Sequence, residues 1–368
     1  MYDVTALVEE PLLFEPLAAS LRGASPSYLR SVKIKLTARC NLRCQMCRYG
    51  RGWKPPELDG ARWRGILDEM AAFGCRKVHF SGGEVLLRSD LEELVAHACA
   101  LRMKVTLTSN LTLLTHERAR VLLRTKLNGL STSLDGASAK THDSIRGIAG
   151  SFKRTLRALT RVARLRRHAV RPQVRVNFVM MRENFREYPE LVRIAAEHGA
   201  CDVVPMPVDT KKERLRLSKR LVREYNDEVA PRVREARALA GMSLDEERIH
   251  PYGLSARAVA ESAEGRYAAD YYRTHPCFAP FLHMFVAWDG KVYLCCMTNG
   301  RIPPLGDLSQ ETVADVFRGA PFQALRRRML SERLEACHTC DMYLPENRAL
   351  EKALPVVLPV VHLPLIGQ

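Results

Sequence analysis

The 368-residue sequence lacks the features of exported and membrane-spanning proteins. Its opening residues have no basic region followed by an apolar run, so no signal peptide is indicated. Three prolines interrupt the most apolar stretch, residues 354–367, which is too short to cross a bilayer. We therefore expect a cytoplasmic protein without a membrane partner.

Internal repeats, low-complexity tracts and recognisable nucleic-acid-binding motifs are also absent from the sequence. The net charge is +16, and basic residues are densest over residues 153–175 and 211–237. Because no aromatic residues are interleaved with these arginines in a known motif, nucleic acid is not an expected partner. We interpret the arginines as a solvated surface, with attraction of a phosphorylated or carboxylated partner as the alternative.

Cysteine, in contrast, is abundant. There are 11 cysteines, and eight of them fall in two groups, at residues 40–47 and 277–340. In a reducing compartment, grouped cysteines favour metal or cluster ligation over disulfides. Cys75, Cys99 and Cys201 stand alone and are expected to be buried core thiols.

The first group, Cys40, Cys44 and Cys47, forms a short loop with spacings of three and two residues. A [4Fe–4S] cluster normally takes four cysteine ligands, so three leave one iron open to bind a small molecule. Structural zinc usually has four ligands and fits three clustered cysteines poorly. On spacing alone, zinc and unligated core thiols remain alternatives.

Strands and helices alternate from residue 31 to about residue 207. Apolar runs predict six strands, each followed by a helical segment, over residues 32–36, 78–80, 105–108, 130–134, 173–181 and 202–205. Six such units predict an α/β fold with a parallel sheet, either open or curled into a partial (β/α)6 TIM-like barrel, whose functional loops gather at the C-terminal ends of the strands. We expect a lead-in over 1–30, the barrel over 31–207, a helical linker over 208–270, a small α+β cluster-binding domain over 271–345 and a tail over 346–368.

Several loops that follow these strands carry residues suited to ligand binding. Gly82-Gly83 would let the backbone approach a ligand where a side chain would collide. Glu84 offers a carboxylate to an ammonium group, and Asn110 could hydrogen-bond a ribose or a carboxylate. A simple strand-to-helix turn is the alternative explanation of the two glycines.

Together, these motifs resemble a radical S-adenosylmethionine (SAM) enzyme over about residues 31–207. The resemblance implies that Cys40, Cys44 and Cys47 hold a [4Fe–4S] cluster whose open iron chelates SAM. One electron would then cleave SAM to a 5′-deoxyadenosyl radical. Arg146 would pair with the SAM carboxylate, with a surface arginine as the alternative, and Glu84 would bind the methionine amine. The remaining implied SAM contacts are Gly82, Gly83, Asn110, Ser133, Asn177 and Val204.

The second cysteine group resembles the SPASM/twitch extension of such enzymes. No cysteine follows Cys340, so Cys277, Cys295, Cys337 and Cys340 imply one auxiliary [4Fe–4S] cluster, as in the twitch form, with four-cysteine zinc as the rival. A hairpin is predicted at Asp289-Gly290. Cys296 should point to the opposite strand face from Cys295. Which of these neighbours is the ligand stays open, and the other could be a core thiol or a hydrogen-atom donor.

The resemblance implies an oxidoreductase supplied by a flavodoxin- or ferredoxin-type electron donor. An auxiliary cluster would accept an electron and favour net oxidation, whereas quenching by Cys296 would give epimerisation. Thirty residues before the first strand are too few for a leader-peptide-binding domain. We therefore expect a small natural-product metabolite (a sugar, aminocyclitol or nucleoside) as substrate, with a ribosomal-peptide maturase or a radical epimerase as the alternative. A non-catalytic metal-binding scaffold is the second alternative.

Overall fold

One continuous sheet organises the part of the chain that the structure describes, with strand order β6-β5-β4-β3-β2-β1-β7-β8-β9. The structure is a computed structural model and describes residues 7, 11–23, 25–49, 52, 55–166, 169–268, 271–331, 334–338, 340 and 344–357. The strands are Ser31–Lys35 (β1), Lys77–Ser81 (β2), Lys104–Thr108 (β3), Gly129–Ser133 (β4), Gln173–Met180 (β5), Asp202–Pro207 (β6), His283–Val286 (β7), Lys291–Tyr293 (β8) and Gly306–Asp307 (β9). The first six confirm the predicted strands to within two residues.

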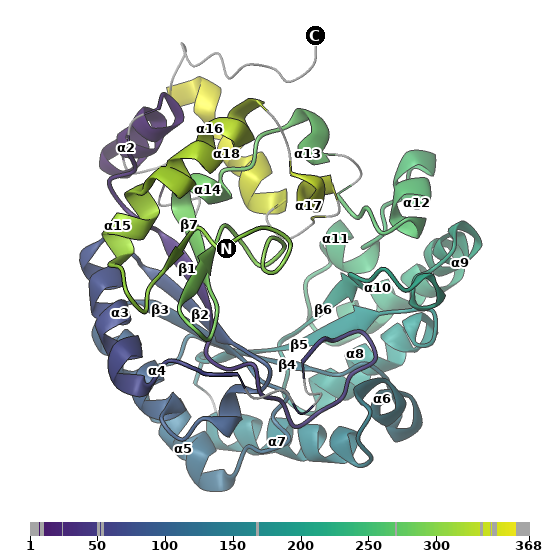
Figure 1. The fold of residues 1–368 in the computed structure, drawn as a ribbon. Helices are drawn as coiled ribbons and strands as arrows, with labels where there is room; N and C mark the ends of the chain where they lie inside the picture. The colour runs from purple at the N-terminus through teal and green to yellow at the C-terminus, as the bar shows by residue number, and fades with distance from the viewer. Residues whose placement is uncertain are drawn as a thin grey trace.

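Helices cover the outside of this curved sheet (Figure 1). Those that follow the first strands are α3 (Gly60–Ala72), α4 (Leu91–Ala100), α5 (His116–Arg124), α6 (Ala139–Arg146), α7 (Ser151–Arg166) and α8 (Tyr188–Glu197). The parallel β-α order from β1 to β6 is the expected partial barrel, and it stays open because β6 is a sheet edge. Pro205 and Pro207 are tolerated in β6 for the same reason. Proline has no amide hydrogen to donate, and one side of an edge strand needs no partner. None of the described helices is long and apolar enough to cross a membrane.

The two faces of the sheet differ in polarity. Along β1, Val32 and Ile34 are fully buried in the core beneath the helices, whereas Lys33 and Lys35 alternate with them and are only partly buried. The same alternation places His79 of β2 and Asn177 of β5 on the inner face. The sequence therefore builds an apolar outer face and a polar lumen.

The C-terminal strands are part of the barrel sheet and not a separate one. β7 pairs in parallel with β1 over residues 31–34 and 283–286, and β8 and β9 continue the sheet as antiparallel strands. Helices α13 (Tyr271–Thr274), α14 (Ala279–Leu282), α15 (Val313–Arg318), α16 (Ala320–Ser331) and α17 (Glu335–His338) surround this end. The predicted hairpin at Asp289-Gly290 joins β7 to β8, so Cys295 and Cys296 directly follow a strand of the same sheet whose β1 precedes the first cysteine loop.

Two segments expected to be irregular contain helices. The lead-in forms α2 (Pro11–Leu21), whose Phe14, Leu17 and Leu21 enter the core although Pro16 lies inside the helix. The expected tail contains most of α18 (Leu344–Val357), and the tail beyond residue 357 lies outside the described residues. Burial of apolar residues, among them Phe14 of α2 and Leu350 of α18, stabilises both helices.

The predicted helical linker is packed against the barrel. It contains α9 (Lys219–Glu224), a π-helical turn (Tyr225–Val229), α10 (Ala230–Leu239), α11 (Glu246–Ile249) and α12 (Ala256–Ala263). Arg237 of α10 is fully buried, and its Nη2 lies 2.6 Å from Asp202 Oδ1 at the start of β6. Arg237 also donates to the carbonyl of Val203 at 2.8 Å.

Removing the charge of Asp202 should destabilise the fold, because Arg237 would be left as an unpaired buried cation. We expect Asp202→Asn to lower the free energy of unfolding by about 3 kcal/mol, measured by urea titration followed by circular dichroism. The matched control is Glu246→Gln, which removes an exposed ion pair with Arg234 and should leave the transition unchanged. Equal transitions for Asp202→Asn and the wild type would contradict this role.

Candidate functional site

The first cysteine loop begins where β1 ends and is bound to the C-terminal end of α6. The amide of Arg43 donates to the carbonyl of Arg146 at 3.0 Å, and the amide of Gln45 donates to that of Ile145 at 2.9 Å. Gly147 ends α6 with φ +70°, and a Cβ there would lie 2.6 Å from the Arg43 carbonyl oxygen. Glycine is therefore required for this close approach.

Hydrogen-bond donors point at each of the three sulfur atoms. The amide of Leu42 lies 3.4 Å from Cys40 Sγ, the amide of Tyr49 lies 3.5 Å from Cys47 Sγ, and Arg146 Nη1 lies 3.6 Å from Cys44 Sγ. Burial raises the pKa of Cys40 to about 11. Donors aimed at sulfur stabilise ligating thiolates, so this loop fits a cysteine-bound cluster.

The Gly82-Gly83 turn has a different contact from the one expected. A Cβ on Gly83 would lie 2.2 Å from the Arg39 carbonyl oxygen, and one on Gly82 would lie 2.7 Å from that of Thr37. The amides of Gly83 and Glu84 donate to these same two carbonyls, each at 2.8 Å. The glycines thus allow the turn to pack on the base of the cysteine loop, and a contact with SAM at Gly82 or Gly83 stays a prediction.

Glu84 is buried and joins the turn to β3. Its Oε1 accepts from the hydroxyl of Ser109 at 2.6 Å and from the amide of Leu86 at 2.9 Å, and its Oε2 accepts from the amide of Asn110 at 2.7 Å. Burial raises the pKa of Glu84, while these donors oppose the rise. A contact with the methionine amine, which stays a prediction, would use the remaining acceptor capacity of Oε2.

Asn110 is held in place by the cysteine loop itself. Its Nδ2 donates to Asn41 Oδ1 at 2.9 Å, and its Oδ1 accepts from the hydroxyl of Thr112 at 2.7 Å. Asn41 lies directly after Cys40 and donates to Thr112 Oγ1 at 2.8 Å. This ring of amides and hydroxyl ties β3 to the loop. The predicted contact of Asn110 with SAM is not tested by it.

Arg146 is a buried residue of the site and not a surface arginine. Its Nη2 lies 2.6 Å from Asp135 Oδ2, and both side chains are almost fully buried. Among the described residues, its Nε has no hydrogen-bond acceptor. A buried donor without an acceptor fits a ligand carboxylate, because leaving it unmatched costs free energy.

Ser133, Asn177 and Val204 lie side by side across three strands. Ser133 of β4 pairs with Asn177 of β5, which pairs with Val204 of β6. All three are partly buried on the inner face. The sheet therefore brings the three side by side on its inner face, at the last residue of β4 and inside β5 and β6.

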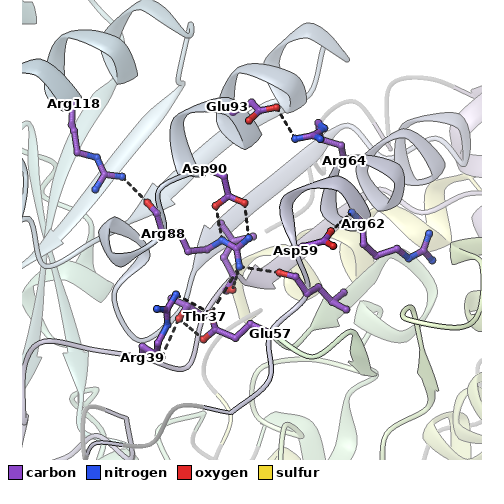
Figure 2. A network of polar contacts seen from close by, with 12 residues as sticks. Thr37, Arg39, Glu57, Asp59, Arg62, Arg64, Arg88, Asp90, Glu93 and Arg118 are labelled. Carbon is purple, nitrogen blue, oxygen red and sulfur yellow. Dashed lines mark hydrogen bonds and ion pairs between the residues drawn. The ribbon is translucent and has the colours of Figure 1, made fainter.

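A network that the motifs did not reveal holds the residues just before Cys40, among them Thr37 and Arg39 (Figure 2). Glu57 Oε1 accepts from the hydroxyl of Thr37 at 2.6 Å and from the amide of Ala38 at 3.0 Å, and Oε2 lies 3.2 Å from Arg39 Nη2. Arg88 Nη1 donates to the Leu36 carbonyl at 3.2 Å. The network holds the chain between β1 and Cys40.

Four cysteines of the second group line one cavity, and these are the four predicted ligands: Cys277, Cys295, Cys337 and Cys340. Asn347 Nδ2 lies 3.7 Å from Cys277 Sγ, and Thr298 Oγ1 lies 3.9 Å from Cys295 Sγ. Across the described ranges, no three metal-binding side chains gather tightly around a single-ion position. The cavity, lined by four thiols from three separate segments, fits a bound cluster.

Cys295 and Cys296 lie in the turn that follows β8 and not in a strand, as the prediction of opposite strand faces had assumed, and the two have different neighbours. Cys296 packs with Tyr49, Phe285 and Trp288 in a cluster against which Cys40 and Cys47 also pack. Tyr49 and Trp288 meet edge-on with ring centroids 5.9 Å apart. The hairpin therefore turns Cys295 towards the second cysteine group and Cys296 towards the first.

A groove lies away from both cysteine groups. It has a volume of about 850 Å3 and lies between α5, α7 and α8, lined by Lys153, Arg157, Arg161 and Arg164 of α7. These residues are the basic stretch interpreted from the sequence as a solvated surface.

Sequence reasoning missed four residues that the fold brings to the two centres: Lys35, Asn41, Glu57 and Asn347. Asn41 had a usable signal, because it is a polar side chain inside the cysteine loop. Glu57 and Asn347 had none, since their partners are distant in sequence. Lys35 was hidden by its place inside an expected strand.

Comparison with known proteins supports both halves of the site. Residues 34–195 match the family model of the radical SAM superfamily, and residues 277–341 match that of the SPASM iron–sulfur cluster-binding domain. An AdoMet-dependent heme synthase of Methanosarcina barkeri is 35% identical over 46% of this chain and 48% of its own length. A PqqA peptide cyclase of Gluconobacter oxydans is 33% identical over 60% of this chain and 61% of its own length. The first match thus spans about half the length of the relative.

The solved structures agree with the fold. SuiB of Streptococcus suis, crystallised with its precursor peptide SuiA, is 15% identical with a TM-score of 0.66, covering 91% of this chain and 76% of SuiB. The two family domains imply a SAM-binding [4Fe–4S] cluster and auxiliary iron–sulfur ligation. The chain belongs to the radical SAM superfamily and carries a C-terminal SPASM domain.

Proposed function

We propose that this chain is a radical SAM enzyme that oxidatively modifies a peptide. The relative named PqqA peptide cyclase carries the proposal, together with the position of Cys296, which follows the cavity-lining Cys295 and packs in the same cluster as Cys40 and Cys47. The expected sugar, aminocyclitol or nucleoside substrate has less support than its alternative. The relatives that support the alternative include PqqA peptide cyclases, one of which matches 60% of this chain. The peptide reading therefore replaces it.

Each cysteine group has one chemical role in this proposal. When bound, a cluster at Cys40, Cys44 and Cys47 supplies the electron that cleaves SAM to a 5′-deoxyadenosyl radical, and a second at Cys277, Cys295, Cys337 and Cys340 supplies an electron acceptor. Arg146 donates Nε to the SAM carboxylate. Phe285 and Trp288, both buried, exclude water from the space beside Cys296. A flavodoxin- or ferredoxin-type protein is the proposed electron donor.

A heme precursor is the second candidate substrate. The relative from Methanosarcina barkeri is named a heme synthase, and its identity of 35% is close to that of the peptide cyclase. Peptide and heme-precursor substrates are distinguished by supplying each to the reconstituted protein and following product masses.

The first prediction concerns turnover. Anaerobically reconstituted wild-type protein with SAM and dithionite should form 5′-deoxyadenosine, and Cys44→Ala should form none, because one ligand of the reactive cluster is lost. Cys99→Ala, which removes a helix thiol outside both groups, is the matched control and should keep wild-type yield. Peptides encoded beside the gene should lose two hydrogen atoms. A wild-type protein that contains iron but forms no 5′-deoxyadenosine would instead support a non-catalytic scaffold.

The second prediction separates the two neighbouring cysteines. Wild-type protein should hold about eight iron atoms per chain, and Cys295→Ala about four, because four cysteines complete a [4Fe–4S] cluster. Cys296→Ala should keep about eight. Loss of iron from Cys296→Ala and not from Cys295→Ala would reverse the assignment.

The third prediction tests oxidation against epimerisation at Cys296. If the enzyme oxidises its substrate, products formed in D2O should contain no carbon-bound deuterium in either wild type or Cys296→Ala. Deuterium uptake by the wild type that Cys296→Ala abolishes would show that the thiol donates a hydrogen atom, and would favour an epimerase.

A further inference from the structure

The groove between α5, α7 and α8 is lined by a row of basic side chains. It has a volume of about 850 Å3, and α5 packs beside α7 on the outside of the sheet and contributes His116 to the lining (Figure 1). Spacings of four, four and three residues put the basic side chains of α7 on one face of the helix: Lys153, Arg157, Arg161 and Arg164. The row therefore follows most of the length of α7.

These basic groups have no acidic partner in the part of the chain that the structure describes. Helix α7 contains no aspartate or glutamate, and none of its four groove-lining side chains forms an ion pair. On other helices, Arg120 pairs with Glu117 and Arg220 pairs with Glu224. Like charges four residues apart repel one another and destabilise a helix. The row on α7 thus favours an anion from outside the protein as its partner.

The lining combines positive charge with aliphatic surface. Arg161 is partly buried, and its Nη1 donates to the Leu114 carbonyl at 2.5 Å, which holds the guanidinium in the groove. Leu156 and Leu165 are also partly buried and line the same groove. Among the described lining residues there is no phenylalanine, tyrosine or tryptophan on which nucleic-acid bases would stack. Such a lining fits an acidic peptide better than a nucleic acid.

The spacing of the row matches an extended chain. Residues four apart on a helix are separated by about 6 Å along its axis, and every second side chain of an extended peptide recurs on the same side after about 6.6 Å. From Lys153 to Arg164 the row covers roughly 16 Å, the length of about five extended residues. Acidic side chains at alternate positions of such a segment would each reach a basic group.

The N-terminal end of the row lies near the first cysteine site. Thr155 of α7 donates its hydroxyl to the Asn110 carbonyl at 3.0 Å, and Asn110 donates to Asn41, the residue after Cys40, at 2.9 Å. Lys153 lies two residues before Thr155 on the same helix. A peptide that leaves the groove at this end therefore reaches the rim of the barrel that carries the cysteine loop.

We propose that this groove binds an acidic, extended segment of the substrate peptide, outside the part that is modified. The inference rests on the proposed peptide-modifying function and names the substrate class more closely: a peptide with acidic side chains at alternate positions. The basic side chains bind the carboxylates, and Leu156 and Leu165 contact the aliphatic parts of the segment. Binding in the groove raises the effective concentration of the rest of the peptide at the rim.

The test measures binding of a synthetic probe to the reconstituted protein by fluorescence anisotropy. The probe is a fluorescein-labelled peptide in which glutamates alternate with serine and leucine, and its control has glutamines in place of the glutamates. The wild type should bind the probe at least tenfold more tightly than the control at low salt. High salt should reduce this difference, because added ions screen exposed charges. Equal binding of the two peptides at low salt would overturn the proposal.

Paired variants locate the binding site. Arg157→Gln/Arg164→Gln should weaken probe binding at least fivefold and keep the iron content of the wild type. The matched control, Arg154→Gln/Arg232→Gln, removes the same charge from two exposed arginines that do not line the groove, one of them on α7, and should change the Kd by less than twofold. Equal losses in the two variants would show that net charge and not the groove attracts the probe, and would contradict the proposal.

A single-stranded oligothymidylate with the same label tests the rival polyanion. It should bind the wild type more weakly than the acidic peptide at the same salt concentration. Tighter binding of the oligothymidylate that Arg157→Gln/Arg164→Gln abolishes would assign the groove to nucleic acid and overturn the proposal.

Probe binding needs no turnover, so a failure of the proposed function is recognised separately, as wild-type protein that binds the probe but forms no peptide product. For an acidic peptide that is modified, Arg157→Gln/Arg164→Gln should raise the KM at least fivefold and leave kcat within twofold of the wild type. An unchanged KM would contradict a role of the groove in substrate binding.

Discussion

Two backbone hydrogen bonds, between the Gly82–Glu84 turn and the base of the cysteine loop, fix the position of the rest of the site. They join the ends of β1 and β2 through the carbonyls of Thr37 and Arg39, each at 2.8 Å. Glu84 then extends the connection to Ser109 and Asn110 at the end of β3. The turn lies so close to the Arg39 carbonyl that no side chain would fit on Gly83. Packing of the backbone therefore accounts for glycine at this position without a ligand contact.

The continuous sheet gives the two cysteine groups a shared frame. Because β7 pairs with β1, the hairpin after β7 is held next to the loop after β1. In the turn that follows β8, Cys295 lines the cavity of the second group and Cys296 packs beside the first. Arg48 and Tyr49 extend the contact, since Arg48 Nη2 donates to the Asn299 carbonyl at 3.4 Å and Tyr49 packs on Trp288.

Local patterns predicted the strands, the hairpin and both cysteine groups, because each depends on residues close together in sequence. The pairing of β7 with β1 was not predictable, since it joins segments about 250 residues apart and no local pattern encodes it. The same distance in sequence hid the contacts of Glu57 and Asn347 with the two sites. It also hid the pairing of Asp135 with Arg146. The helix at Pro11–Leu21 was not predicted, and it is the tertiary burial of Phe14, Leu17 and Leu21 that stabilises it.

The most direct test of this account is the iron content of Gly83→Ala. The added Cβ would lie 2.2 Å from the Arg39 carbonyl oxygen, so the cysteine loop must shift. We expect about four of about eight iron atoms per chain to remain, from the auxiliary cluster, with no 5′-deoxyadenosine formed. Gly65→Ala, whose Cβ would meet only the Arg62 side chain at 3.8 Å, should match the wild type in both measurements. Full iron content and normal 5′-deoxyadenosine yield in Gly83→Ala would contradict the account.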